Sequence, residues 1–240
     1  HRPTPSTPTF RRLSADGSLF AHFFLLFLPM TSPFVITVGR QLGSGGRQIG
    51  KRLAERFGIA YYDKEILSLA AQESGLGTGV FERSDERKGF LHSIAQVVQP
   101  FFGGGGSFYD NQLSDENLFT IQSRVIQKVA AERSCVVIGR VADYILRHHP
   151  NHVNVFITAS MSERVQEMMR RRGIDAKSAR RILEEADEER ATYYNFYSLG
   201  TWGTAETYDL CVNSSVLGAD GTTDFIARFV SERFGLGENV

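Results

Sequence analysis

Short apolar runs alternate with segments of helical periodicity along most of this 240-residue chain. The runs lie at 34–38, 60–62, 135–138, 153–157 and 208–212. Strands that are apolar on both sides, and that are separated by helices, are typical of a parallel sheet covered on both faces. The sequence therefore predicts an α/β fold of three layers, in which a five-stranded parallel sheet lies between helices.

Helix start and stop signals lie between these runs. Gly58 is expected to end the first helix, and Asp63 can cap the next one. Ser114 can cap the helix before the third strand. Further helices are predicted at 141–147, about 161–172, about 178–195 and 224–235.

A glycine-rich segment, Gly43-Ser44-Gly45-Gly46, follows the first predicted strand. Glycines at a helix N-terminus let backbone N–H groups approach a phosphate, which the helix dipole also favours. The full motif G-x-x-x-x-G-K-[ST] is not present: Gly46 stands at the lysine position, and Arg47 or Gln48 at the Ser/Thr position. Arg47 is then the one loop residue expected to supply the missing charge. The alternative is a tight turn with close helix–strand packing.

Several motifs together resemble the bacterial cytidylate kinase-like family. They are ITVGRQLGSGGRQIGKRLAERFGIAYYDKEIL, VVIGRVADYIL, VFITASMSERVQEMMRRRG, ADEERATYYNFY, Trp202-Gly203 and YDLCVNSS, which span Phe34 to about Phe234. The resemblance implies a P-loop fold like that of the nucleoside monophosphate kinases, with an acceptor insertion at about 66–113 and a mobile helical lid at about 161–205. It also implies ATP-dependent phosphoryl transfer to a nucleoside monophosphate, nominally CMP or dCMP. Mg²⁺ would arrive with ATP, held by phosphates and water.

The resemblance assigns residues to the acceptor side of such a site. Asp63 follows the second strand, where the family has an aspartate near the acceptor; a simple helix cap is the alternative. Arg140 follows the third strand, where cytidylate kinases have an arginine that meets the acceptor phosphate. An arginine at the carboxyl end of a parallel strand points into the ligand crevice, and a surface ion pair is the alternative.

The predicted lid is rich in charge. Seven arginines and eight acids lie between Ser160 and Arg190, and we expect most of them to form solvated pairs. Arg190, with Asp187 three residues before it, matches the family's acidic–arginine lid motif. Because lid arginines neutralise the transferring phosphoryl group in nucleoside monophosphate kinases, Arg190 and Arg47 are the candidate catalytic cations.

The resemblance also assigns Asn213 and Ser214, just after the fifth strand, to the position where such kinases hold the adenine edge. A group of aromatic residues matches the family as well, and buried packing under the lid is their expected role. The group consists of Tyr193, Tyr194, Trp202 and Tyr208.

Charge and composition limit the partners. Lys+Arg and Asp+Glu are both 27, so the net charge gives no general attraction to nucleic acid or to an anionic membrane. The apolar stretch at 19–28 is too short to span a bilayer, which takes about 20 residues. We expect no nucleic-acid or membrane partner; the resemblance implies small-molecule nucleotides as partners, and the oligomeric state stays open.

Three histidines, His148, His149 and His152, lack a second set of ligands, so no metal site is expected there. Cys135 and Cys211 lie far apart in apolar runs, which predicts buried free thiols and a reducing, cytoplasmic location.

Residues 1–29 do not fit the rest of the pattern. We expect translation to start at Met30 and residues 30–240 to form one domain; a signal-like segment is the alternative for 1–29. For the whole chain, two functional alternatives stay open: a catalytically silent nucleotide-binding regulatory module, and a kinase for another small acceptor.

Overall fold

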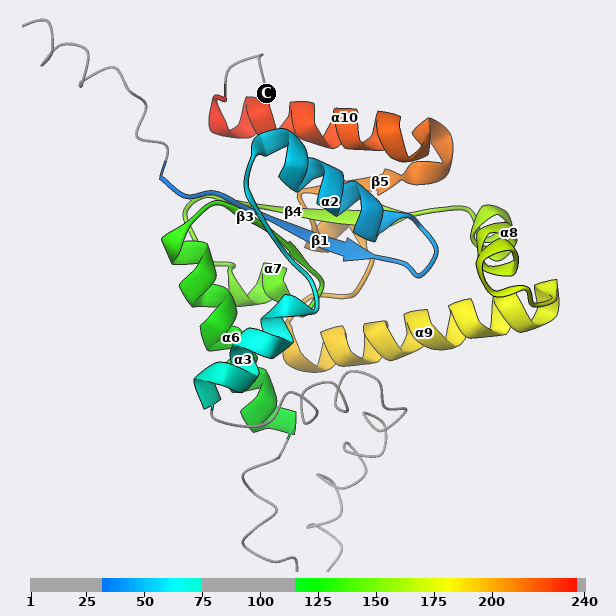
Figure 1. The fold of residues 1–240 in the computed structure, drawn as a ribbon, viewed down its shortest axis with the longest axis horizontal. Coiled ribbons are helices and arrows are strands. Elements are labelled where there is room, and N and C mark those ends of the chain that lie inside the picture. Colours follow the sequence, from blue (N-terminus) through cyan, green and yellow to red (C-terminus); the bar gives the residue numbers. More distant parts are fainter. Residues whose placement is uncertain (1–31, 75–114, 237–240) are drawn as a thin grey trace, which may run out of the picture. The chain divides into compact units, whose positions relative to one another are not determined.

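The computed structural model describes residues 32–74 and 115–236. The segment 1–29, most of the predicted acceptor insertion and the Ser114 cap lie outside these residues. In the described part, five strands form one parallel sheet in the order β2-β3-β1-β4-β5, which confirms the predicted fold class (Figure 1). The strands are β1 (Val35–Arg40), β2 (Ala60–Tyr62), β3 (Cys135–Ile138), β4 (His152–Thr158) and β5 (Leu210–Asn213).

Helices cover both faces of the sheet. On one face, α2 (Gly46–Phe57) and α10 (Ser214–Phe234) pack on a core that includes Ile36 and Val38 of β1. On the other, α3 (Glu65–Ser74), α6 (Asp115–Glu132) and α7 (Ala142–Ile145) pack on a core that includes Val35. Successive residues of β1 thus face opposite layers, which places β1 in the middle of the molecule's apolar interior.

The lid helices α8 (Met161–Arg172) and α9 (Ala176–Tyr197) have a small apolar core of their own. Met168, Ala179 and Leu183 are buried in it, and Leu42 from the glycine-rich loop packs against them. Asp175 caps α9, where its carboxylate accepts from two backbone N–H groups. The loop and the lid therefore share apolar contacts.

Three helices differ from their predicted bounds. α7 is shorter than the predicted 141–147 helix. α9 extends two residues further at each end than the predicted 178–195 helix. α10 begins at Ser214, ten residues before the predicted start. Its first turn is separated from the rest by a kink at Gly218, whose φ is 66°. Hydrophobic periodicity did not predict this turn, because its apolar side chains, Val216 and Leu217, are exposed and do not lie on a buried helix face.

The two cysteines differ in exposure. Both are free thiols, and Cys135 is buried, but Cys211 is exposed, so its predicted burial is wrong. Burial raises the pKa of the Cys135 thiol to about 12. Among the helices of residues 32–74 and 115–236, none is long and apolar enough to cross a membrane.

Candidate phosphate-binding and lid site

The glycine-rich loop joins the carboxyl end of central strand β1 to the N-terminus of α2. Gly43 and Gly45 have φ values of 82° and 76°, which favour glycine because a Cβ is strained there. Gly45 precedes the first helical residue, and no side chain of the described residues caps α2. A Cβ on Gly45 would meet only Ile49 Cδ1, at 3.8 Å. Backbone N–H groups of the first turn are therefore accessible to an anion.

One serine bonds within the loop and a second joins the loop to the sheet. Ser44 is 3% exposed, and its Oγ donates to Gln41 O at 2.9 Å. The hydroxyl of Ser214 lies 2.8 Å from Ser44 O and 3.1 Å from Thr158 O. Ser214, expected at the adenine edge, thus contacts the loop backbone and the end of β4.

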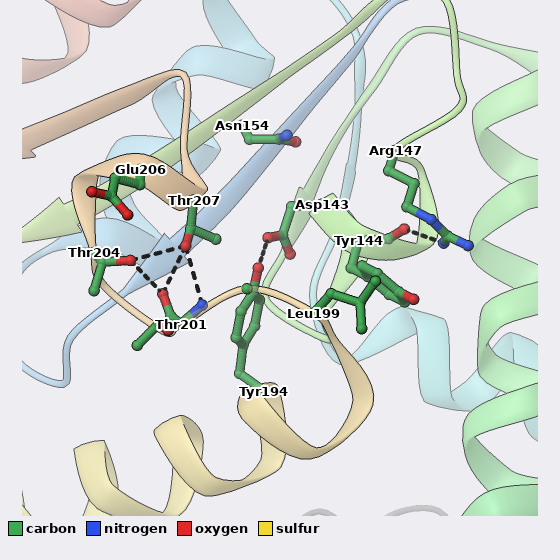
Figure 2. A pocket seen from close by; sticks show the side chains of 11 residues that line it. Asp143, Tyr144, Arg147, Asn154, Tyr194, Leu199, Thr201, Thr204, Glu206 and Thr207 are labelled. Carbon is green, nitrogen blue, oxygen red and sulfur yellow. Dashed lines mark hydrogen bonds between the residues drawn. The ribbon is translucent and has the colours of Figure 1, made fainter.

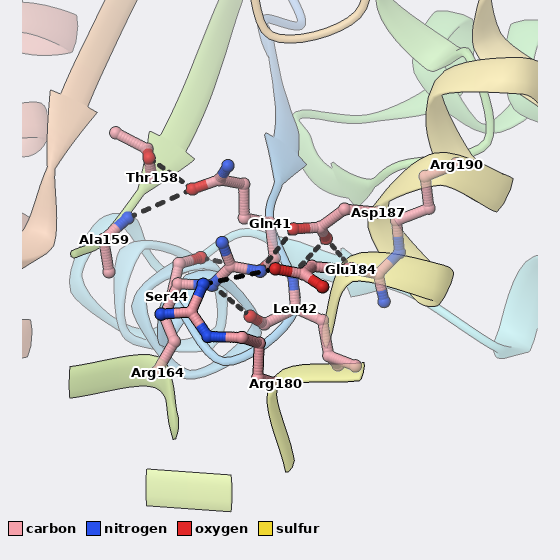
Figure 3. Close-up of polar contacts among 10 residues, drawn as sticks. All are labelled: Gln41, Leu42, Ser44, Thr158, Ala159, Arg164, Arg180, Glu184, Asp187 and Arg190. Carbon is pink, nitrogen blue, oxygen red and sulfur yellow. Dashed lines mark hydrogen bonds and ion pairs between the residues drawn. The ribbon is translucent and has the colours of Figure 1, made fainter. Parts of the chain in front are cut away.

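Gln41 ties the loop to the chain that follows β4. Its Oε1 accepts from the Thr158 hydroxyl and from Ala159 N, the latter at 3.4 Å (Figure 3). Asn213 uses its Oδ1 to accept from Ser215 N at 3.0 Å, so the side chain caps α10. The amide nitrogen is then the part of Asn213 that could face a base.

Leu42 is held by the lid through both of its backbone polar groups. Arg164 Nε donates to Leu42 O at 2.7 Å, and Leu42 N donates to Asp187 Oδ1 at 2.8 Å (Figure 3). Arg164 and Asp187 also form an ion pair, with side chains 3% and 13% exposed. We call this arrangement of Leu42, Arg164 and Asp187 the loop–lid clamp.

The remaining lid charges are more exposed. Arg190 Nη1 lies 3.4 Å from Asp187 Oδ1, at the edge of the clamp. Arg180 pairs with Glu184 at 3.2 Å, and both side chains are more than half exposed, as the i,i+4 spacing predicts. The sequence did not distinguish Arg164 from the arginines of these solvated pairs, because its partner Asp187 lies 23 residues further along the chain.

Asp63 lies beside the loop but is not a helix cap. Its Oδ2 pairs with the Arg47 guanidinium, and α3 begins only at Glu65, so the cap interpretation is wrong. The side chain of Asp63 is 8% exposed, and its Oδ1 has no hydrogen-bond partner among the described residues. Arg47 and the neighbouring Gln48 are exposed. The pairing directs Arg47 toward Asp63. The carboxylate of Asp63 therefore partly neutralises the charge that Arg47 could offer to a phosphoryl group.

The turn after β3 is strained. Gly139, Arg140 and Val141 have consecutive positive φ values of 67°, 64° and 56°. A β-branched residue such as Val141 rarely adopts this conformation, and such outliers cluster at ligand sites. The half-buried Arg140 is therefore presented at the carboxyl end of β3, next to the glycine-rich loop.

Sequence reasoning missed Arg40, the last residue of β1. Burial, and next the positive charge of Arg190, lower the pKa of Arg40 to about 10, while Asp63 acts in the opposite direction. Arg140 and Arg47 also lower it. Three other arginines thus act on Arg40, which adds a cation from the end of β1 to the Arg47 that was expected to supply charge from the loop.

A separate pocket of about 370 Å³ lies beside the middle of β4 (Figure 2). Asp143 and Tyr194 line it and are joined by a hydrogen bond from the tyrosine hydroxyl. Burial raises the pKa of Asp143, and burial together with the Asp143 charge raises that of Tyr194. None of the site residues predicted from the sequence lines this pocket.

The predicted aromatic residues pack below the lid. Tyr194 and Tyr208 are 6% and 8% exposed, and Trp202 packs edge-on against Phe156 with ring centroids 5.1 Å apart. Tyr193 lies against Phe119 with ring centroids 6.5 Å apart. Buried packing is therefore confirmed for Tyr194 and Tyr208, whereas Tyr193 and Trp202 pack on other rings but are only half-buried.

The fold and the loop define a nucleotide-binding protein of the P-loop class. The profile of the cytidylate kinase-like family matches residues 35–216, and the chain belongs to this family. Membership supports phosphoryl transfer of the nucleotide-kinase type.

The chain is also similar to curated cytidylate kinases and, in its fold, to a solved structure. A cytidylate kinase of Methanopyrus kandleri is 27% identical over 199 residues, covering 78% of this chain and 88% of that protein. One from Pyrococcus horikoshii is 25% identical over 189 residues, covering 78% and 83%. The crystal structure of an uncharacterized protein from Eubacterium ventriosum has a TM-score of 0.62 at 28% identity, covering 82% of this chain and 98% of that one.

Proposed function

We propose that this protein transfers the γ-phosphoryl group of ATP to a nucleoside monophosphate, nominally CMP or dCMP. The observation that carries the proposal is the uncapped start of α2, preceded by Gly45, at the carboxyl end of the central strand. Ligands of open parallel sheets bind at this end, and phosphates bind at helix N-termini. The open space around the Gly45 Cβ position fits the approach of a triphosphate.

Each side of the site has its own residues. The Gly43–Gly46 backbone would hold the phosphates of ATP, and Asn213 lies where the adenine edge is expected. Arg140 and Asp63, at the ends of β3 and β2, would bind and orient the acceptor. Arg190 would add charge from the lid, and Arg47 from the start of α2.

The residues present fit a magnesium ion that arrives with the nucleotide. Mg²⁺ keeps several waters and uses one or two carboxylates besides the phosphates. Asp63, with its buried and unpartnered Oδ1, could accept from a water of that ion. When bound, the ion would neutralise phosphate charge during transfer.

A coupled assay with a panel of acceptors tests the proposal. Purified full-length protein, ATP and Mg²⁺ would be incubated with CMP, dCMP, UMP, AMP and GMP, following ADP release and identifying the phosphorylated product. We expect turnover to be highest with CMP or dCMP. ATP binding without turnover on any acceptor would favour the silent regulatory module, for which the missing lysine is the supporting feature. Turnover only with a small acceptor outside the panel would favour the other kinase alternative.

A further inference from the structure

The space at the missing lysine is occupied by Arg40. In G-x-x-x-x-G-K-[ST] the lysine follows the last glycine, and Gly46 stands at that place here. A Cβ on Gly46 would lie 2.6 Å from Arg40 Cβ and 3.1 Å from Arg40 Cγ. Any side chain at position 46 would therefore overlap the stem of Arg40. The glycine at this position makes room for an arginine that comes from β1.

The guanidinium of Arg40 lies against the turn after β3. A Cβ on Gly139 would overlap Arg40 Nη1 and lie 3.1 Å from Arg40 Cζ. β1 and β3 are parallel neighbours with Val38 opposite Ile138, so their carboxyl ends lie together. Arg40 thus extends from the phosphate loop at its stem to Gly139 at its head. The next residue is Arg140, which the proposed function places at the acceptor phosphate.

The charges around Arg40 indicate an anionic ligand. Arg190, Arg140 and Arg47 all act on its guanidinium, and Asp63 is the opposing charge. Asp63 pairs with Arg47, and Arg190 contacts Asp187. Within residues 32–74 and 115–236, no carboxylate forms an ion pair with Arg40. A half-buried cation among other cations is unfavourable until an anion reaches it.

Building on the proposed function, we propose that Arg40 takes the place of the P-loop lysine and binds the oxygens of the transferring γ-phosphoryl group. Its stem lies at the donor loop and its head next to the acceptor-side turn, and the transferring group passes between these two places. During transfer, an oxygen of the acceptor phosphate forms a bond to the γ-phosphorus. The bond from that phosphorus to the β–γ bridging oxygen breaks, and its electron pair leaves with ADP.

Arg40 takes no proton in this step. It stays charged at neutral pH and neutralises the equatorial oxygens, which is where phosphoryl-transfer catalysis gains most. The planar fork of an arginine can bind two phosphoryl oxygens at once, whereas a lysine acts as a point charge.

The ratio of ATP affinity to ADP affinity is the decisive measurement, because only ATP carries the γ-phosphoryl group. Both affinities would be measured by calorimetry with Mg²⁺ and without acceptor. In Arg40→Gln we expect ATP affinity to fall roughly 10- to 100-fold, with a much smaller change for ADP. Arg40→Lys should lose less than Arg40→Gln. Arg228→Gln is the control for charge loss, because Arg228 is exposed and pairs with Glu232 at 3.1 Å.

A second pair of variants moves the guanidinium without removing it. The Cβ of Gly139→Ala would displace Arg40 Nη1, and the backbone there has a φ of 67°. Gly58→Ala is the matched control: φ is 62° there, and its Cβ would meet no atom within 4 Å. Both variants carry similar backbone strain, but we expect only Gly139→Ala to lower the ATP/ADP affinity ratio. This pair decides the question if Arg40→Gln folds poorly.

An ATP/ADP affinity ratio that is unchanged in both Arg40→Gln and Gly139→Ala would overturn the role of Arg40. If Arg40→Gln weakened the binding of ATP and of ADP equally, the arginine would only support the loop, which holds the phosphates common to both nucleotides. An active wild type with such ratios would leave the proposed function intact. Wild type that binds ATP without turnover would contradict the proposed function while the ratio still tests Arg40. Wild type without ATP affinity would contradict both.

Discussion

The loop–lid clamp makes a quantitative prediction about stability. Arg164→Met removes the guanidinium that binds Leu42 O and pairs with Asp187, while it keeps an apolar stem of similar length. Because the side chains of Arg164 and Asp187 are 3% and 13% exposed, the loss leaves a largely buried carboxylate without its main partner. Breaking one side of a buried ion pair lowers the free energy of unfolding by about 3–5 kcal/mol.

The size of the chain converts this loss into a melting temperature. A domain of this length loses about 2–4 °C per kcal/mol, so Arg164→Met should melt roughly 6–20 °C below wild type. Arg180→Met is the matched control, since it is the same substitution in the same lid. Arg180 and Glu184 are 56% and 54% exposed, and such pairs contribute about 0.3–0.5 kcal/mol. The control should therefore melt within about 2 °C of wild type.

Circular dichroism would follow thermal and urea unfolding of both variants. A double variant, Arg164→Met with Asp187→Leu, adds a further check: it removes both members of the buried pair, so neither is left without the other, and it should be less destabilised than the sum of the two single variants. If Arg164→Met melts no lower than Arg180→Met, the clamp does not contribute to stability and the reasoning from burial fails.

Two further predictions concern the ends of the sheet and the pocket. Arg140→Ala should raise the acceptor KM roughly 10- to 100-fold with little change in the ATP KM, since a lost charge-assisted contact costs about 1.5–3 kcal/mol; equal effects in steady-state kinetics would remove Arg140 from the acceptor side. Asp143 has a raised pKa in the folded state, so its contribution to stability is complete below its ordinary pKa and is lost as pH rises through the folded value. Asp143→Asn should remove this decline in stability. The melting temperatures of wild type and variant would be measured from pH 4 to 8, and a constant difference between them over this range would contradict the prediction.

The local pattern of the chain was enough to predict its layers. β3 is apolar at every position and lies inside the sheet, because a continuous β-branched run needs cover on both faces. α8 spans Met161–Arg172, in agreement with the helix predicted at about 161–172, and Ser160 and Gly173 cap its two ends. The predicted α10 was too short at its start, because the first turn of the helix carries exposed apolar residues before the kink at Gly218. Local signals therefore predicted β3 and α8 well, but the Asp175 cap of α9 and the first turn of α10 were missed.

The candidate site depends on contacts between residues far apart in sequence. Arg164 looked like one of many lid charges, and only the fold brings it to Asp187 and Leu42. Asp63 had the spacing of a helix cap, but Arg47 competes for its carboxylate. Sequence spacing could not identify the partners of Arg164 and Asp63, because the tertiary fold and the burial of each side chain determine them.

The position of Arg40 is reflected in the sequence by two glycines, but neither glycine indicates it on its own. Gly46 and Gly139 are separated by 93 residues, and each has a reason to be glycine that involves Arg40, since a Cβ on either would displace it. Taken alone, a glycine in place of the loop lysine looks like a lost catalytic charge. Taken with the arginine that fills the space, it is an exchange of one cation for another, delivered from the strand instead of the helix. The strand origin has a physical consequence: the stem of Arg40 starts on the central strand of the sheet, so its position varies less with movement of the loop than that of a side chain on the loop itself.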